Sequence, residues 1–167
     1  MKTIVAAAIG ECVHVAGVSN FLRLAEQVGW RTIFLGPATP IEKLIETAER
    51  ENADMVGVSY RLTPENGERL LGEFAEEADA LRNKGVKFAF GGTPPVVERI
   101  EKLEFFENCF DGTETTEEVI AYLKGKDISI QQEKNFPQKT VDRINWKSPY
   151  PLIRHHFGLP TMEATLE

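Results

Sequence analysis

The sequence TIVAAAIGECVHVAG, residues 3–17, joins a short apolar run to a turn that is bracketed by glycines and carries one histidine. The apolar run, Thr3 to Ile9, has the composition and length of a β-strand. The turn places His14 just beyond the carboxyl end of this strand, where open α/β sheets bind their ligands. We therefore expect His14 to contact a ligand at the edge of a sheet.

Similar apolar runs recur along the chain and alternate with segments of helical periodicity. They predict four further strands, at 32–35, 55–59, 86–90 and 108–110. Apolar side chains between the strands fall on one helical face in three segments: Phe21, Leu24, Ala25 and Val28; Ile41, Leu44, Ile45 and Ala48; and Leu70, Leu71, Phe74, Ala78 and Leu81. This alternation predicts a three-layer α/β domain with a doubly wound, five-stranded parallel sheet of flavodoxin-like or Rossmann-like type, in strand order 2-1-3-4-5.

Signals for helix boundaries support this segmentation. Residues 39–42 combine a capping-box pair with Pro40 at the first helical position, and residues 115–118 repeat the capping box. Three glycines are expected to end helices, namely Gly29, Gly85 and Gly125.

The predicted strand order fixes where a ligand would bind. The strand order reverses between the first and third strands, so the loops after Ile9 and Val58 are expected to face one crevice. The loop that contains Gly91 and Gly92 lies beside them. Three separate loops are therefore expected to converge on one ligand.

The composition narrows the classes of protein to which the chain belongs. It has 167 residues, 42% of them hydrophobic, which suffices for one well-buried core at residues 1–125. Four prolines interrupt residues 126–167, so we expect an irregular tail or a linker to a partner or further domain there. A net charge of −7 disfavours binding to nucleic acid, and no apolar run is long enough to cross a bilayer. The two cysteines, Cys12 and Cys109, are expected to be reduced thiols of a cytoplasmic protein.

Three familiar ligand sites of this architecture do not match these loops. A phosphoacceptor domain needs an aspartate at the end of the third strand, where this chain has Ser59. A flavodoxin-type phosphate cradle needs several hydroxyl side chains in the first loop, and a dinucleotide site needs Gly-x-Gly-x-x-Gly; both are absent. The strongest functional group in the first loop is the imidazole of His14, a common ligand of transition metals.

The spacing of these residues resembles that of the cobalamin-binding domain family, whose motif is Asp-x-His-x-x-Gly, then Ser-x-Leu, then Gly-Gly. The resemblance covers residues 3–125, with His14 and Gly17 in the first element, Ser59 in the second and Gly91-Gly92 in the third. Taken alone, His14 would be interpreted as a surface-loop histidine and Gly91-Gly92 as a tight turn. Within the family, the opening residues look most like the small cobalamin-binding subunit of glutamate mutase and those of related adenosylcobalamin-dependent mutases.

The resemblance implies a cobalamin held with its lower base displaced and the imidazole of His14 bound to cobalt instead. The displaced nucleotide tail would enter the crevice, where glycines allow close approach of the backbone and hydroxyl groups can donate hydrogen bonds. The implied cofactor-binding residues are His14, Gly17, Val18, Ser59, Leu62, Thr63, Gly91, Gly92 and Thr93, with Gly112 and Thr113 as weaker candidates in a loop that would close over the tail.

The chain departs from the family pattern at two positions. Cys12 replaces the aspartate that normally accepts the second ring N–H of the histidine, and loss of such a partner typically weakens metal sites by about 10- to 100-fold. Arg61 occupies the place of the motif leucine, and Leu62 follows one place late. We therefore expect ligation of cobalt by His14 without the usual proton relay.

Three functions are compatible with such a domain. The expected one is the cofactor module of an adenosylcobalamin-dependent isomerase, a mutase or aminomutase, inactive without a barrel-type catalytic subunit or domain. The alternatives are a corrinoid methyl carrier of a methyltransferase system and a non-enzymatic cobalamin sensor or storage protein. The first strand begins at residue 3, without the helical cap of methyl carriers, which favours the mutase and adenosylcobalamin over methylcobalamin. Association with further copies of the chain is compatible with each function.

Overall fold

The computed structural model describes residues 1–126 and contains a single five-stranded sheet within them. All strand pairs are parallel, and the order is β2-β1-β3-β4-β5. The strands are β1 (Thr3–Ala8), β2 (Arg31–Phe34), β3 (Met55–Ser59), β4 (Lys87–Gly91) and β5 (Asn108–Phe110). The predicted fold class and strand order are thereby confirmed; the predicted tail at 126–167 lies almost entirely outside the described residues.

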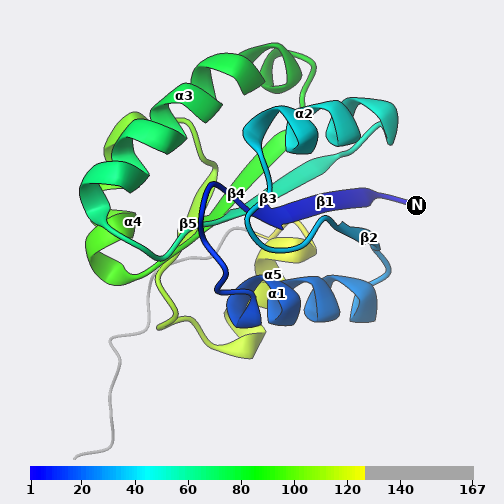
Figure 1. The fold of residues 1–167 in the computed structure, drawn as a ribbon. Coiled ribbons are helices and arrows are strands. Elements are labelled where there is room, and N and C mark those ends of the chain that lie inside the picture. Colours follow the sequence, from blue (N-terminus) through cyan, green and yellow to red (C-terminus); the bar gives the residue numbers. More distant parts are fainter. Residues whose placement is uncertain (127–167) are drawn as a thin grey trace, which may run out of the picture. The chain divides into compact units, whose positions relative to one another are not determined.

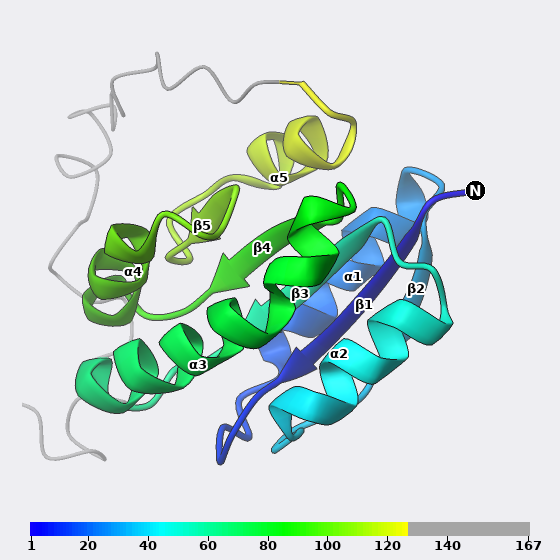
Figure 2. The same cartoon turned by 90° about the horizontal axis from the view of Figure 1, so that it is seen from above.

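Helices cover both faces of the sheet (Figures 1 and 2). Helices α2, α3 and α4 lie on one face, and α1 and α5 lie on the other. Their bounds are α1 (Ala16–Gln27), α2 (Ile41–Arg50), α3 (Pro64–Asn83), α4 (Pro94–Ile100) and α5 (Thr116–Leu123), with a 3₁₀ turn η1 (Glu101–Leu103) after α4. In the described part of the chain, no helix is long and apolar enough to span a membrane.

Each face of the sheet has its own hydrophobic core. The α2–α3–α4 face is filled by large aromatic residues, including Phe74, Phe88 and Phe90. On the other face, the indole N–H of Trp30 donates to the carbonyl of Leu123 (3.0 Å) and ties the end of α5 to the start of β2. Phe21, Phe110 and Tyr122 also pack on this second face.

Most predicted helix boundaries are observed, and one is not. Thr115 caps α5 in a full capping box with Glu118, as predicted. The predicted capping box at 39–42 is wrong, because α2 begins one residue later, at Ile41, with Pro40 as its N-cap. The Thr39 hydroxyl donates to the Gly36 carbonyl (3.1 Å), because the Thr39 backbone pairs with β1 and turns the side chain toward the preceding loop.

The glycines predicted to end helices follow α1, α3 and α5 with positive φ angles of 93°, 91° and 71°, for Gly29, Gly85 and Gly125 respectively. Three strands differ by one residue from their predicted positions, and of these β1 ends at Ala8 instead of Ile9. β2 begins and ends one residue early, and β4 runs from 87 to 91 because the Val86 N–H bonds back to Leu81 and closes α3. These shifts leave the sheet order unchanged.

Candidate functional site

A cavity of about 200 Å³ lies on the α1–α5 face of the sheet, at the carboxyl ends of β3 and β4. Its floor is formed by small residues of these two strands, and its walls by Phe21 of α1, Phe110 of β5 and Val119 of α5. Loop residues at its rim include Arg61, Gly112 and Glu114. The cavity is thus enclosed by elements that are far apart in the sequence.

The strand register explains why there is space at this position. Ala6, Gly57 and Ala89 are register partners across β1, β3 and β4, and they form a row of small residues. Two residues further along, on the same face, Ser59 pairs with Gly91. Because these side chains are small, they leave part of the space between the sheet and helices α1 and α5 unfilled.

The adjacent glycines Gly91 and Gly92 have different environments. A Cβ atom at Gly91 would have no heavy atom within 4 Å, so a side chain there would extend into open space at the cavity. A Cβ atom at Gly92 would lie 2.8 Å from the carbonyl oxygen of Tyr60 and 2.9 Å from the Phe90 ring. Gly91 therefore keeps the cavity open, and Gly92 allows the close approach of the β3 and β4 ends.

Ser59 is the polar residue of the cavity floor. Its side chain is buried, and its hydroxyl group has no hydrogen-bond partner among residues 1–126. Because Ser59 lines the cavity, its hydroxyl group can form a hydrogen bond with a ligand there.

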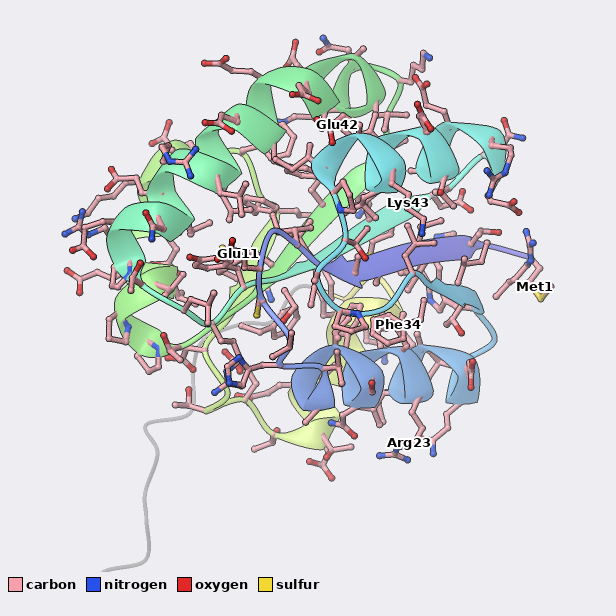
Figure 3. All side chains as sticks on the ribbon, in the orientation of Figure 1. Met1, Glu11, Arg23, Phe34, Glu42 and Lys43 are labelled. Carbon is pink, nitrogen blue, oxygen red and sulfur yellow. The ribbon has the colours of Figure 1, made fainter. Side chains whose placement is uncertain are left out.

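His14 lies in the loop between β1 and α1 and is exposed. Its Nδ1 atom is 3.8 Å from the Sγ atom of Cys12, which is completely buried and fixed by backbone hydrogen bonds to Ile9 and Ala38. Glu11 precedes them in the same loop (Figure 3), and no hydrogen bond joins it to His14. The thiol of Cys12, which stands at the position of the motif aspartate, thus lies beside Nδ1, and no described residue is hydrogen-bonded to Nε2.

The described residues contain no group of three or more His, Cys, Asp or Glu side chains that could hold a metal ion. A metal bound at His14 would therefore take most of its ligands from elsewhere. A corrin ring supplies four nitrogen ligands to its cobalt, so a single imidazole suits this cofactor better than a free metal ion.

The structure brings together only part of the predicted binding residues. Those that line the cavity are Gly17, Val18, Ser59, Gly91, Gly92 and Gly112. The predicted residues His14, Leu62, Thr63, Thr93 and Thr113 lie in the loops at the carboxyl ends of the strands but do not line it. Thr63 and Thr93 are the N-cap residues of α3 and α4, and Thr113 bonds to Asp111 (2.6 Å).

Several cavity residues were not predicted from the sequence. Gly57 could have been predicted, because a glycine within a buried strand often marks a place where a ligand or another backbone segment approaches closely. Phe21, Phe110 and Val119 look like ordinary core residues, and only the tertiary structure places them together. Glu114 is held at the rim by accepting the N–H groups of Asp111 and Gly112, at 3.1 and 3.0 Å.

Two ionisable groups, one in β5 and one in α5, have raised pKa values. Burial raises the pKa of the Cys109 thiol to about 12, and the negative charge of Glu101 adds to this shift. Burial also raises the pKa of Tyr122 well above its usual value, assisted by the neighbouring carboxylate of Glu107. Both cysteines are free thiols, as predicted, and a neutral Cys109 is a poor metal ligand.

The sequence pattern of the B12 binding domain matches residues 2–120 of the chain. The chain belongs to this family. The resemblance to cobalamin-binding domains that the spacing of His14, Ser59 and Gly91 indicated is thereby confirmed.

Curated relatives of this B12-binding domain include two corrinoid proteins. Dimethylamine corrinoid protein 3 of Methanosarcina mazei is 30% identical over 125 residues, which cover 72% of this chain and 74% of that protein. The dimethylamine corrinoid protein of Methanosarcina barkeri is 29% identical over 113 residues, covering 65% of this chain and about half (52%) of that protein.

Solved structures show the same fold. A cobalamin-binding protein from Desulfitobacterium hafniense superposes with a TM-score of 0.62 at 22% identity, covering 74% of this chain and 58% of that one. The methanol:cobalamin methyltransferase complex of Methanosarcina barkeri gives a TM-score of 0.57 at 20% identity, with 75% and 48% covered. At these identities the similarity concerns the fold of the B12-binding domain.

Proposed function

We propose that this B12-binding domain, residues 1–125, is the corrinoid carrier of a methyl-transfer system. In this proposal cobalamin binds with its lower base displaced, His14 reaches the cobalt, and the nucleotide tail enters the cavity beneath α1 and α5. The observation that carries the proposal is the cavity itself, whose floor of small residues lies at the carboxyl edge that also holds the His14 loop.

The residues of the cavity suit the displaced tail. Gly57 and Gly91 leave space for a flat base against the sheet, and Phe21 provides an aromatic wall. Ser59 offers an unpaired hydroxyl group for a polar atom of the tail. At the rim, the thiol of Cys12 would keep the imidazole of His14 oriented through its Nδ1 side, leaving Nε2 for the cobalt.

Bound cobalamin would supply a cobalt centre that can accept a methyl group and pass it on. The chain's own contribution is to hold the cofactor, to orient the imidazole and to keep the tail away from the cobalt. Both curated relatives are named dimethylamine corrinoid proteins. Their similarity to this chain favours methyl carriage with methylcobalamin over the mutase function with adenosylcobalamin that the sequence alone led us to expect.

A carrier of this kind needs a catalytic partner, because no described residue is arranged to activate a methyl donor or acceptor. We propose a catalytic methyltransferase subunit as the partner, without assigning its fold. The free thiols of Cys12, which is buried, and Cys109, which is half-buried, favour a reducing compartment, so the proposal places the chain in the cytoplasm.

Binding is tested by titrating hydroxocobalamin and methylcobalamin into the full chain and recording absorption spectra. We expect the wild type to give the absorption spectrum of cobalamin whose lower base is displaced. We expect His14→Ala to change this spectrum. A double His155→Ala/His156→Ala variant removes the other two histidines and serves as the matched control, expected to behave as wild type. No binding, or identical spectra for wild type and His14→Ala, would contradict the proposal.

Methyl carriage is distinguished from isomerisation in an extract of the source cells. The chain is loaded with methylcobalamin that carries a radioactive methyl group, and transfer of label to an added thiol acceptor is measured. We expect faster transfer from the loaded wild type than from free methylcobalamin. Absence of transfer, together with cobalt–carbon cleavage in the adenosylcobalamin-loaded chain, would favour the mutase instead.

A further inference from the structure

Arg61 brings a positive charge to the rim of the cavity. It lies two residues beyond the end of β3, lines the cavity and is exposed. Its Nη1 atom would be 3.9 Å from a Cβ atom built at Gly17, so the guanidinium lies beside the first turn of α1. The absence of a side chain at Gly17 leaves this group uncovered.

Within residues 1–126, Arg61 has no hydrogen-bond or ion-pair partner. The other charged side chain that lines the cavity, Glu114, already accepts two backbone N–H groups. By contrast, Arg99 on α4 bonds to both Glu65 and Glu68. In a chain with a net charge of −7, an arginine left without a carboxylate at a cavity rim is set up to receive an anionic group of a ligand.

The size of the cavity indicates which part of the cofactor carries that anion. Whole small-molecule ligands occupy pockets of about 300–1,000 Å³. A cavity of about 200 Å³ is too small for a corrin ring, so only the nucleotide tail fits inside. In cobalamin, a phosphodiester links the ring side chain to the ribose and base. If the base lies against Gly57 and Ala89 inside the cavity, the phosphodiester comes closer to the rim.

We infer that the guanidinium of Arg61 binds the phosphodiester of the cobalamin nucleotide tail, making Arg61 a specificity-determining residue for the complete cofactor. The inference rests on the proposed binding of the tail in this cavity. It also gives a role to the departure at Arg61, where the family motif has a leucine that can make no such charge-assisted contact.

The test compares cobalamin with cobinamide, a corrinoid that lacks the nucleotide and its phosphodiester. Dissociation constants are measured for the wild type, Arg61→Gln and Arg61→Lys. We expect Arg61→Gln to bind cobalamin about tenfold more weakly, as for loss of one charge-assisted hydrogen bond, and to bind cobinamide like the wild type. Arg61→Lys should fall between the two, because it keeps the charge and loses the planar fork.

Arg69→Gln is the matched control, since Arg69 is an exposed arginine on α3, across the sheet from the cavity, paired only with Glu73. It should leave both affinities unchanged, and thermal unfolding should show that all variants are folded. Inorganic phosphate titrated into the cofactor-free chain should bind far more weakly than cobalamin; phosphate binding of equal strength would overturn the inference in favour of a free-anion site.

Unchanged cobalamin affinity in Arg61→Gln would overturn the inference while leaving the proposed function intact. An equal loss for cobalamin and cobinamide would also overturn it, because Arg61 would then act on the corrin ring. If the wild type binds neither corrinoid, the proposed function fails, and the inference fails with it.

Discussion

Gly91 and Gly92 show how neighbouring residues of one motif serve different purposes. Gly91 has open space where a side chain would start, whereas Gly92 has a carbonyl oxygen and an aromatic ring there. The sequence could predict the pair as a motif but not this division, because the division depends on where Tyr60 and Phe90 lie relative to each glycine.

Gly91→Leu is therefore expected to fill the cavity without unfolding the domain. Cobalamin affinity should fall by more than about tenfold, because the added side chain clashes with the tail. Gly72→Leu is the matched control, since Gly72 on α3 also has no heavy atom within 4 Å and does not line the cavity. Equal cobalamin affinities for Gly91→Leu and the wild type, measured by titration, would show that the tail does not enter this cavity.

Gly92→Ala is expected to act on stability instead. The added methyl group overlaps the Tyr60 carbonyl and the Phe90 ring, and such overpacking typically costs about 1–3 kcal/mol. Urea unfolding followed by circular dichroism measures the loss. A stability equal to that of the wild type would mean that the β3 and β4 ends separate without penalty.

Cys12→Asp restores the acidic residue of the family motif. Cys12 is completely buried, so a carboxylate there must pair with His14 or lower the stability of the cofactor-free chain. With the cofactor bound, we expect about 10- to 100-fold tighter binding, because the carboxylate orients and strengthens the imidazole ligand. Cys12→Ser is the uncharged control, and affinities that do not differ between the two variants would exclude this role.

At the scale of elements, α5 shows what local sequence can and cannot predict. Its capping box is encoded within four residues, 115–118, and was predicted correctly. The capping box predicted at 39–42 is wrong because the Thr39 backbone pairs with β1. This contact is long-range, and the local sequence does not reveal it. The role of α5 as a cavity wall was likewise hidden, since Val119 lines the cavity only because α5 packs beside α1.

Thr115→Ala removes the cap of α5 and should destabilise the domain by about 1 kcal/mol. Because α5 forms one wall of the cavity, the same change should weaken cobalamin binding slightly. Thr116→Ala, at the next position, keeps the cap and is the control. Thermal unfolding and cobalamin titration of both variants provide the comparison, and equal stability of the two would contradict the capping role.

At the scale of the whole molecule, the topology of the sheet could be predicted from the sequence. Strand order and parallel pairing were predictable, because buried apolar runs alternate with amphipathic helices and crossovers are right-handed. The cavity was not, because it arises from rows of small residues whose alignment across β1, β3 and β4 is fixed only by the register. The departure at Arg61 was visible in the sequence, but its place at the cavity rim was not.

The stability of the whole domain should decrease at alkaline pH. Cys109 has its pKa raised from 9.0 to about 12, and the pKa of Tyr122 is raised as well. In the unfolded chain these groups lose their protons at lower pH, so unfolding releases protons and the free energy of unfolding falls as the pH rises above about 9. Below about pH 9 both groups are protonated in the folded and in the unfolded chain, so their full contribution to the free energy of unfolding is present.

Urea unfolding at a series of pH values measures this effect, with Cys109→Ala and Tyr122→Phe as variants that lack one titrating group each. Each variant should lose less stability than the wild type between pH 9 and 12. Parallel curves for the wild type and both variants would show that neither group is shifted by its burial.

Ligation of cobalt by His14 is tested most directly by electron paramagnetic resonance of cob(II)alamin bound to chain labelled uniformly with ¹⁵N. The unpaired electron couples to the nitrogen in the lower axial position, and ¹⁵N splits the lines differently from ¹⁴N. We predict the ¹⁵N pattern for the wild type and its loss in His14→Ala. A ¹⁴N pattern in the labelled wild type would mean that the cofactor's own base remains on the cobalt, and it would contradict the account.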